Sequence, residues 1–140
     1  MTKEFAPQFD TAYVIRAANK DSIPQHDLFS VSAITLDDLV PKAKKCRRSV
    51  MKLDVQGHEC FVLKNSQGFF SNVDVPFIVM EWILANRVER ECNLAMIKTL
   101  IQLGYQPWYM SEKEKVPLET LVRSVDYAND ELFDLIWKKI

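Results

Sequence analysis

Glycine is scarce in this chain, which has three glycines among its 140 residues. None of them (Gly57, Gly68, Gly104) lies in a glycine-rich loop between a strand and a helix, the arrangement that cradles phosphates and nucleotide cofactors. The sequence also lacks GxSxG, and neither histidine has a serine or cysteine at motif spacing. These absences exclude the common nucleotide-binding loops and give no sign of a serine or cysteine hydrolase.

A charge imbalance is also missing, because the formal net charge is −1. That value gives no electrostatic case for binding nucleic acid or an anionic membrane. The basic run at 42–48 is a local exception, and such runs are usually solvated loops rather than binding patches. No apolar run approaches the ~20 residues that span a bilayer, and residues 1–10 lack the apolar segment of a signal peptide. We therefore expect no nucleic-acid partner, no membrane segment in this chain and a cytoplasmic location.

The cysteines Cys46, Cys60 and Cys92 are odd in number, far apart and without CxxC spacing. This pattern indicates neither a disulfide framework nor a zinc site. We expect reduced thiols, which agrees with a reducing compartment.

What the chain does have is the composition of a globular domain, with 48% hydrophobic and 26% charged residues. Its apolar runs predict strands at 12–17, 29–34, 49–55, 75–82, 105–110 and 132–137. Helical periodicity predicts helices at 58–64 and 86–103. Thr35 is expected to cap a short helix that Pro41 ends.

The alternation of strand and helix after residue 49 predicts an α/β fold, with a mainly parallel sheet covered by helices. The strand at 49–55 is mostly apolar, so we expect it to be buried on both faces. The last two strands are joined by a polar connection with little regular structure, which favours antiparallel pairing between them.

Carboxylates follow or end two consecutive strands of this predicted sheet. Asp54 lies at the end of the strand at 49–55, and Glu81 near the end of the next, while Glu59 opens the helix after Asp54. Ligands of open α/β sheets bind at the carboxyl ends of the strands, so these three side chains are candidates for one site. Plainer roles stay open: Glu59 serving the helix dipole, Asp54 capping the helix and Glu81 pairing with a lysine.

Four segments together resemble a known family. They are TLDDL at 35–39, LDVQGHECFVL at 53–63, VPFIVMEW at 75–82 and GY at 104–105. This set is similar to the FkbM family of S-adenosylmethionine-dependent methyltransferases, and it covers about residues 29 to 110 well. The resemblance implies a partial class I methyltransferase fold, which is Rossmann-like, with one antiparallel strand in a mainly parallel sheet. The strands from residue 49 on would be strands four to seven.

The resemblance also implies a function and a site. It implies methylation of a hydroxyl on a small molecule or glycan, with S-adenosylmethionine as cofactor. The implied catalytic residues are Asp54, Glu59 and Glu81, and the implied cofactor-binding residues are Asp54, Val55, Gln56 and Gly57. Gln56 stands where many members have glutamate.

The largest departure from the family is the missing glycine-rich cofactor loop. Residues 1–28 are too few for strands one to three, so we expect a single partial domain over 1–140, with 29–140 as its second half and weak or no activity alone. One alternative is a non-catalytic module that associates through an exposed sheet edge. Another is a metal-dependent hydrolase or lyase that uses Asp54, His58, Glu59 and Glu81.

Overall fold

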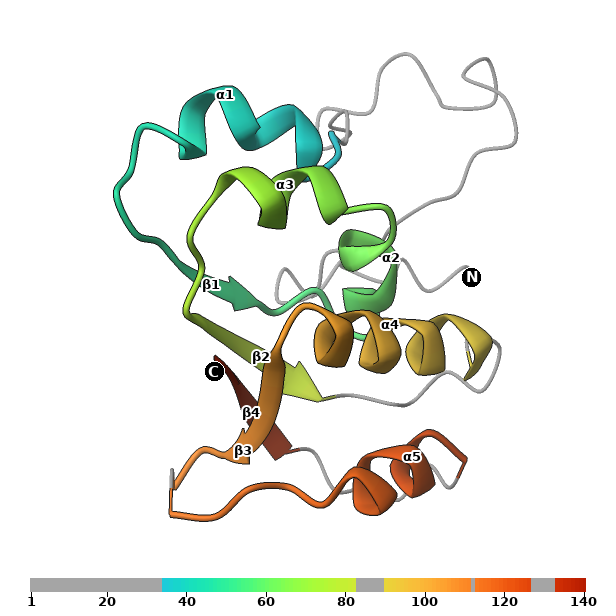
Figure 1. Cartoon of the computed structure of the whole chain (residues 1–140). Coiled ribbons are helices and arrows are strands. Elements are labelled where there is room, and N and C mark those ends of the chain that lie inside the picture. The colour runs from blue at the N-terminus through green and yellow to red at the C-terminus, as the bar shows by residue number, and fades with distance from the viewer. Residues whose placement is uncertain (1–33, 83–89, 112, 127–132) are drawn as a thin grey trace, which may run out of the picture. The chain divides into compact units, whose positions relative to one another are not determined.

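The computed structural model describes residues 34–82, 90–111, 113–126 and 133–140, which belong to the unit Ile34–Ile140 (Figure 1). The strands predicted at 12–17 and, but for Ile34, at 29–34 lie outside the described residues. None of the helices in the described part is long and apolar enough to cross a membrane.

The described unit contains a four-stranded sheet in the order β1-β2-β4-β3. Its strands are β1 (Val50–Leu53), β2 (Phe77–Trp82), β3 (Tyr105–Tyr109) and β4 (Phe133–Lys139). β1 and β2 pair in parallel, whereas β4 pairs antiparallel with both β2 and β3. The prediction of a mainly parallel sheet is therefore wrong for the strand pairings, because the one reversed strand lies between two others. The predicted antiparallel pairing of the last two strands is confirmed.

Alternate residues of β2 face two different environments. Ile78, Met80 and Trp82 are at most 2% exposed, whereas Phe77 on the other face is 42% exposed. The three buried side chains belong to one core cluster with residues of the helices α2 (Glu59–Leu63), α3 (Gln67–Asn72) and α4 (Arg90–Gln102). The helices therefore cover one face of β2.

β1 is less buried than predicted. Val50 is 66% exposed and Lys52 is exposed, while Leu53 is buried. The prediction of burial on both faces is wrong, because Val50 and Lys52 share a face that is exposed to solvent. In the sheet of the described residues, β1 is the edge strand, with β2 as its neighbour. An apolar run reports on hydrophobicity and does not reveal which strand lies at the edge.

The first described helical segment begins as predicted but does not end as predicted. Thr35 and Asp38 hydrogen-bond reciprocally, with the Asp38 amide donating to Thr35 Oγ1 at 3.3 Å. A 3₁₀ helix (Asp37–Leu39) leads into α1 (Val40–Ala43), and Pro41 lies in the first turn of α1. Pro41 therefore starts a helix instead of ending one, because the first turn needs no amide donor from it.

The helix α3 was not predicted, and a distant contact explains its position. The Asp37 carboxylate accepts a hydrogen bond from the Phe69 amide at 2.7 Å. A Cβ at Gly68 would clash with the same carboxylate, so glycine is required for this close approach. α3 thus depends on a residue about thirty positions away, which local periodicity does not reveal.

A disulfide joins Cys60 of α2 to Cys92 of α4, with a Cα–Cα distance of 5.6 Å, while Cys46 is free and exposed. The prediction that all three thiols are reduced is therefore wrong. Spacing along the chain could not reveal the pair, because the fold brings together two helices that are 32 residues apart.

The second half of the unit follows the prediction more closely. The helix predicted at 86–103 is α4, described from Arg90 onward, and Gly104 ends it with a φ of 86°. The polar connection after β3 contains a longer helix than expected, α5 (Leu118–Asp126). Its Ser124 hydroxyl accepts a hydrogen bond from the Trp82 indole at 3.0 Å, which ties α5 to β2.

Candidate functional site

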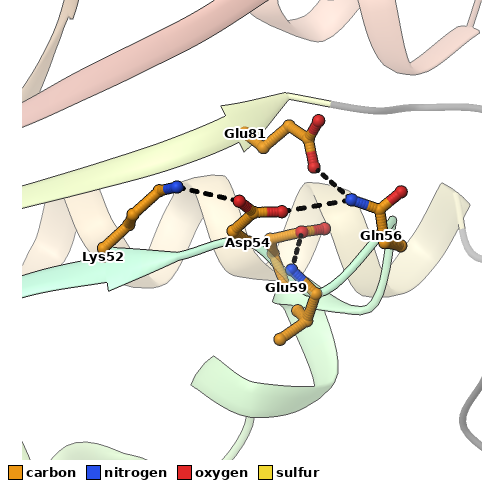
Figure 2. Close-up of polar contacts among 6 residues, drawn as sticks. Lys52, Asp54, Gln56, Glu59 and Glu81 are labelled. Carbon is orange, nitrogen blue, oxygen red and sulfur yellow. Dashed lines mark hydrogen bonds and ion pairs between the residues drawn. The ribbon is translucent and has the colours of Figure 1, made fainter. Parts of the chain in front are cut away.

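Asp54 and Glu81 come together at the carboxyl ends of β1 and β2. The parallel register pairs Leu53 with Met80. The residues that follow them, Asp54 and Glu81, therefore carry their carboxylates to the same edge of the sheet. Figure 2 shows the Gln56 amide between the two side chains. Its nitrogen donates one hydrogen bond to Asp54 Oδ1 at 3.1 Å and another to Glu81 Oε2 at 2.9 Å.

Lys52 completes the immediate surroundings of Asp54. It lies two residues earlier on the same strand face, and its ammonium donates to Asp54 Oδ2 at 2.8 Å. The pKa of Asp54 lies below its usual value because of this hydrogen bond first, then hydrogen bonding with the Glu81 carboxyl, then the bond from Gln56. The same ion pair raises the pKa of Lys52. Asp54 is therefore held as a carboxylate and Lys52 as an ammonium.

Glu81 has the opposite character. Burial raises its pKa first, and hydrogen bonding to Asp54 and the negative charges of Asp54, Asp134 and Glu59 raise it further. Asp134 lies directly opposite Glu81 in the register of β2 and β4. Of the two joined carboxyls, Glu81 is the one that binds a proton more readily, and a raised pKa suits a general base.

The turn after β1 has an uncommon backbone. Gln56 has a φ of 53° and Gly57 a φ of 86°, so two consecutive residues are left-handed. For a non-glycine residue this conformation costs about 1 kcal/mol or more, and it persists where surrounding contacts fix it. Here it directs the Gln56 side chain back over the strand ends (Figure 2).

Glu59 supplies the contacts that fix this turn. Its side chain is 4% exposed, and Oε1 accepts hydrogen bonds from the amides of Val55 at 3.1 Å and Gly57 at 3.4 Å. A ring nitrogen of His58 lies 3.2 Å from the Val55 carbonyl. The structure therefore brings Asp54 and Glu81 together and directs Glu59 to the backbone of the turn.

Two residues beside the site, Lys52 and Asp134, were not predicted from the sequence. Lys52 could have been predicted, because a residue two positions before Asp54 on a strand shares its face. Asp134 could not have been, because only the register of β4 against β2 places it opposite Glu81. Among the described residues, no group of three or more His, Cys, Asp or Glu side chains could hold a metal ion. The described structure thus gives no support to a metal site at Asp54, His58, Glu59 and Glu81.

Comparison with protein families shows which family the residues of this site belong to. A profile described as the methyltransferase FkbM domain matches residues 10–107. The chain belongs to the FkbM methyltransferase domain family. The match begins earlier than the motifs did, and it includes Asp54, Gln56 and Glu81. Searches of curated proteins and of solved structures each gave no significant match.

Membership in the FkbM family implies S-adenosylmethionine as cofactor, and the donor set of the site fits one end of that molecule. The Asp54, Glu81 and Asp134 carboxylates suit a cationic sulfonium and ammonium. The sequence has three glycines and no glycine-rich loop that would hold the adenosine end. The residues of the site therefore fit the end of the cofactor that carries the sulfonium and the ammonium.

Proposed function

We propose that this chain carries the reacting edge of an S-adenosylmethionine-dependent methyltransferase that acts on a hydroxyl of a small molecule or glycan. The observation that carries the proposal is the pair of carboxyls on adjacent parallel strands, Asp54 and Glu81, joined by the Gln56 amide within the family-matched segment. Ligands of open α/β sheets bind at this edge, which supports placing the reaction there.

The two carboxyls would have different tasks. When bound, S-adenosylmethionine supplies a methyl group on a positively charged sulfur, which departs as a neutral thioether. Glu81, whose pKa is raised, would take the proton that the acceptor hydroxyl loses. Asp54, held ionised by Lys52, would accept a hydrogen bond that orients the acceptor. A positioned base contributes roughly 100- to 10,000-fold in rate.

Other residues of the turn would position cofactor and acceptor. Asp54, Val55, Gln56 and Gly57 form the segment that would hold the methionine end of the cofactor. Glu59 would act through this segment, because its carboxylate binds the amides of Val55 and Gly57. Positioning of this kind lowers the entropic barrier of a two-substrate reaction.

We also propose that the described unit corresponds to the second half of a class I methyltransferase sheet. In support, the last strand β4 is the one that runs antiparallel to its neighbours, as the resemblance implies for strand seven. The sequence contains no glycine-rich loop for the adenosine end, so the chain alone would show weak activity.

The state of the cysteines bears on the cellular compartment of the protein. The cytoplasmic location stays a prediction, and the disulfide between Cys60 and Cys92 points the other way. Disulfides persist mainly in oxidising compartments. Thiol titration in denaturant, after purification under non-reducing conditions, tests the pairing, because Cys60 is buried in the native protein. One reactive thiol, Cys46, supports an oxidising compartment, and three support the cytoplasm.

Calorimetric titration with S-adenosylmethionine and S-adenosylhomocysteine tests the proposed cofactor. We expect binding of the wild type, weakened at least tenfold in Asp54→Asn with nearly unchanged thermal stability. Arg48→Gln is the matched control, because it removes an exposed ion pair with Asp74 away from the site. A large loss of stability in Asp54→Asn would instead make Asp54 a structural cap, and absence of binding by the wild type would contradict the proposal.

Self-association through β1 is the second candidate function. Val50 is 66% exposed on this edge strand, and a groove of about 530 Å³ lies beside it. The apolar residues that line the groove include Leu36, Leu39, Ala43, Val50, Met51 and Phe69. Edge strands pair readily with other chains. Sedimentation should show a dimer that Val50→Lys dissociates and Ile101→Lys, on exposed α4 surface, does not.

A further inference from the structure

The Gln56 amide uses both of its N–H donors on carboxylates. One goes to Asp54 and the other to Glu81, at 3.1 and 2.9 Å, and the carbonyl oxygen points away from both (Figure 2). The reverse orientation would set an oxygen without a proton against two carboxylates. The amide therefore has one favourable orientation, and in it a neutral group separates two like charges.

We propose that Gln56 is a positioning residue that holds Asp54 and Glu81 in a fixed relation and thereby sets the pH at which Glu81 accepts the acceptor's proton. This inference rests on the proposed methyl transfer for its chemistry, and on the hydrogen bonds and the backbone of the turn for its geometry.

The backbone supports this role because it is unfavourable for glutamine. Glycine adopts a φ of 53° without steric cost, whereas glutamine is strained in this conformation. The strain is maintained by Glu59, which binds the amides on both sides of Gln56. A left-handed glutamine whose side chain makes two hydrogen bonds to the candidate site is best explained by what those bonds do.

The charges around Glu81 show why a neutral donor matters there. The groups that act on it are Asp54, Asp134 and Glu59, which are negative, and Lys52, which is positive and pairs with Asp54. A third carboxylate in place of the amide would disfavour ionisation of both Asp54 and Glu81. The amide instead stabilises the charged form of each by donating to it.

Carboxyl titration by carbon-13 NMR on the whole chain tests the proposal, with signals assigned through Asp54→Asn and Glu81→Gln. In Gln56→Gly both carboxyls lose a donor, so both midpoints should move upward by about half a pH unit or more. In Gln56→Glu a charge is added as well, so the upward shift should be larger. Gln102→Glu, at the exposed end of α4, is the matched control and should leave both midpoints unchanged.

Thermal stability and activity separate the possible failures. Gln56→Gly should melt at or above the wild-type temperature, because glycine accepts the left-handed backbone. The low-pH limb of methyl transfer should move upward with the Glu81 midpoint. Carboxyl midpoints equal to the wild type in both Gln56 variants would overturn the inference. Absence of methyl transfer by the wild type, also with the cofactor-binding half of a family member supplied in trans, would refute the proposed function. The carboxyl titration would still decide whether Gln56 positions the pair.

Discussion

The two faces of β2 have different surroundings, because one packs into the core and the other carries Glu81 at the candidate site. Met80 is fully buried in the core cluster, whereas its neighbour Glu81 faces Asp54, Gln56 and Asp134. Met80, which stabilises the fold, is followed directly by Glu81, which we propose takes part in the reaction. Substitutions on the two faces should therefore separate stability from activity.

Met80→Ala should give the largest loss of stability. Met80 is 0% exposed, and removing a buried side chain of this size costs about 2–5 kcal/mol through lost burial and the cavity left behind. Chemical denaturation measures the change in free energy of unfolding. A loss as small as that of Val79→Ala, at a partly exposed position on the opposite face, would contradict the comparison of the two faces.

Removal of the disulfide should have the next largest effect. Cys60→Ser together with Cys92→Ser removes a link across 32 residues and should cost about 3 kcal/mol. Because α2 also carries Glu59, the double variant tests whether the helix pair supports the turn at the site. Cys46→Ser is the control, since this thiol is free and exposed. Equal melting temperatures of the double variant and the control would show that the link does not stabilise the fold.

Tyr105→Phe should lower stability by about 1 kcal/mol, because the tyrosine hydroxyl donates to the buried Val75 carbonyl. Burial raises the pKa of Tyr105 to about 12. The folded state therefore keeps the proton longer than the unfolded state. Its contribution to stability is complete below about pH 10 and is lost as the pH rises toward 12. Denaturation curves at several alkaline pH values should show this loss in the wild type and not in Tyr105→Phe.

Lys52→Met should have the smallest effect on stability, because the ion pair with Asp54 is exposed to solvent and such pairs contribute little to the free energy of unfolding. Its effect on titration should be clear, since the pKa of Asp54 should rise when its first hydrogen-bond donor is lost. The lowered pKa of Asp54 gives stability that is present above its unfolded pKa and is lost as the pH falls. Acid unfolding of Lys52→Met should therefore begin at higher pH than that of the wild type, and identical acid curves would contradict the assignment.

Much of the apolar framework could be predicted from the sequence. β2 and α4 were predicted because their apolar residues are numerous and periodic. The end of α4 at Gly104 and the start of the first helical segment at Thr35 follow from local chemistry. The exposure of β1 could not be predicted, because it depends on which strands pair. The disulfide and α3 depend on contacts across about thirty residues, which no local pattern carries.

The part of the candidate site that lies at strand ends could be predicted from the sequence. Asp54 and Glu81 were predicted because carboxyl ends of neighbouring parallel strands share an edge, and the structure places them together. The bridging role of Gln56 depends on a left-handed backbone that glutamine seldom adopts, so the sequence did not reveal it. The structure directs Glu59 to the turn through a hydrogen-bond geometry that residue type alone does not specify.

The most direct test of the central claim is methyl transfer from S-adenosylmethionine to a panel of hydroxyl acceptors by the wild type and Glu81→Gln. The account predicts that Glu81→Gln lowers the rate by about 100-fold or more, while its melting temperature stays near that of the wild type. If the chain alone transfers too slowly to measure, both proteins are to be assayed with the cofactor-binding half of a family member supplied in trans. Equal rates for the two proteins, with measurable transfer by the wild type, would contradict the assignment of Glu81 as the base.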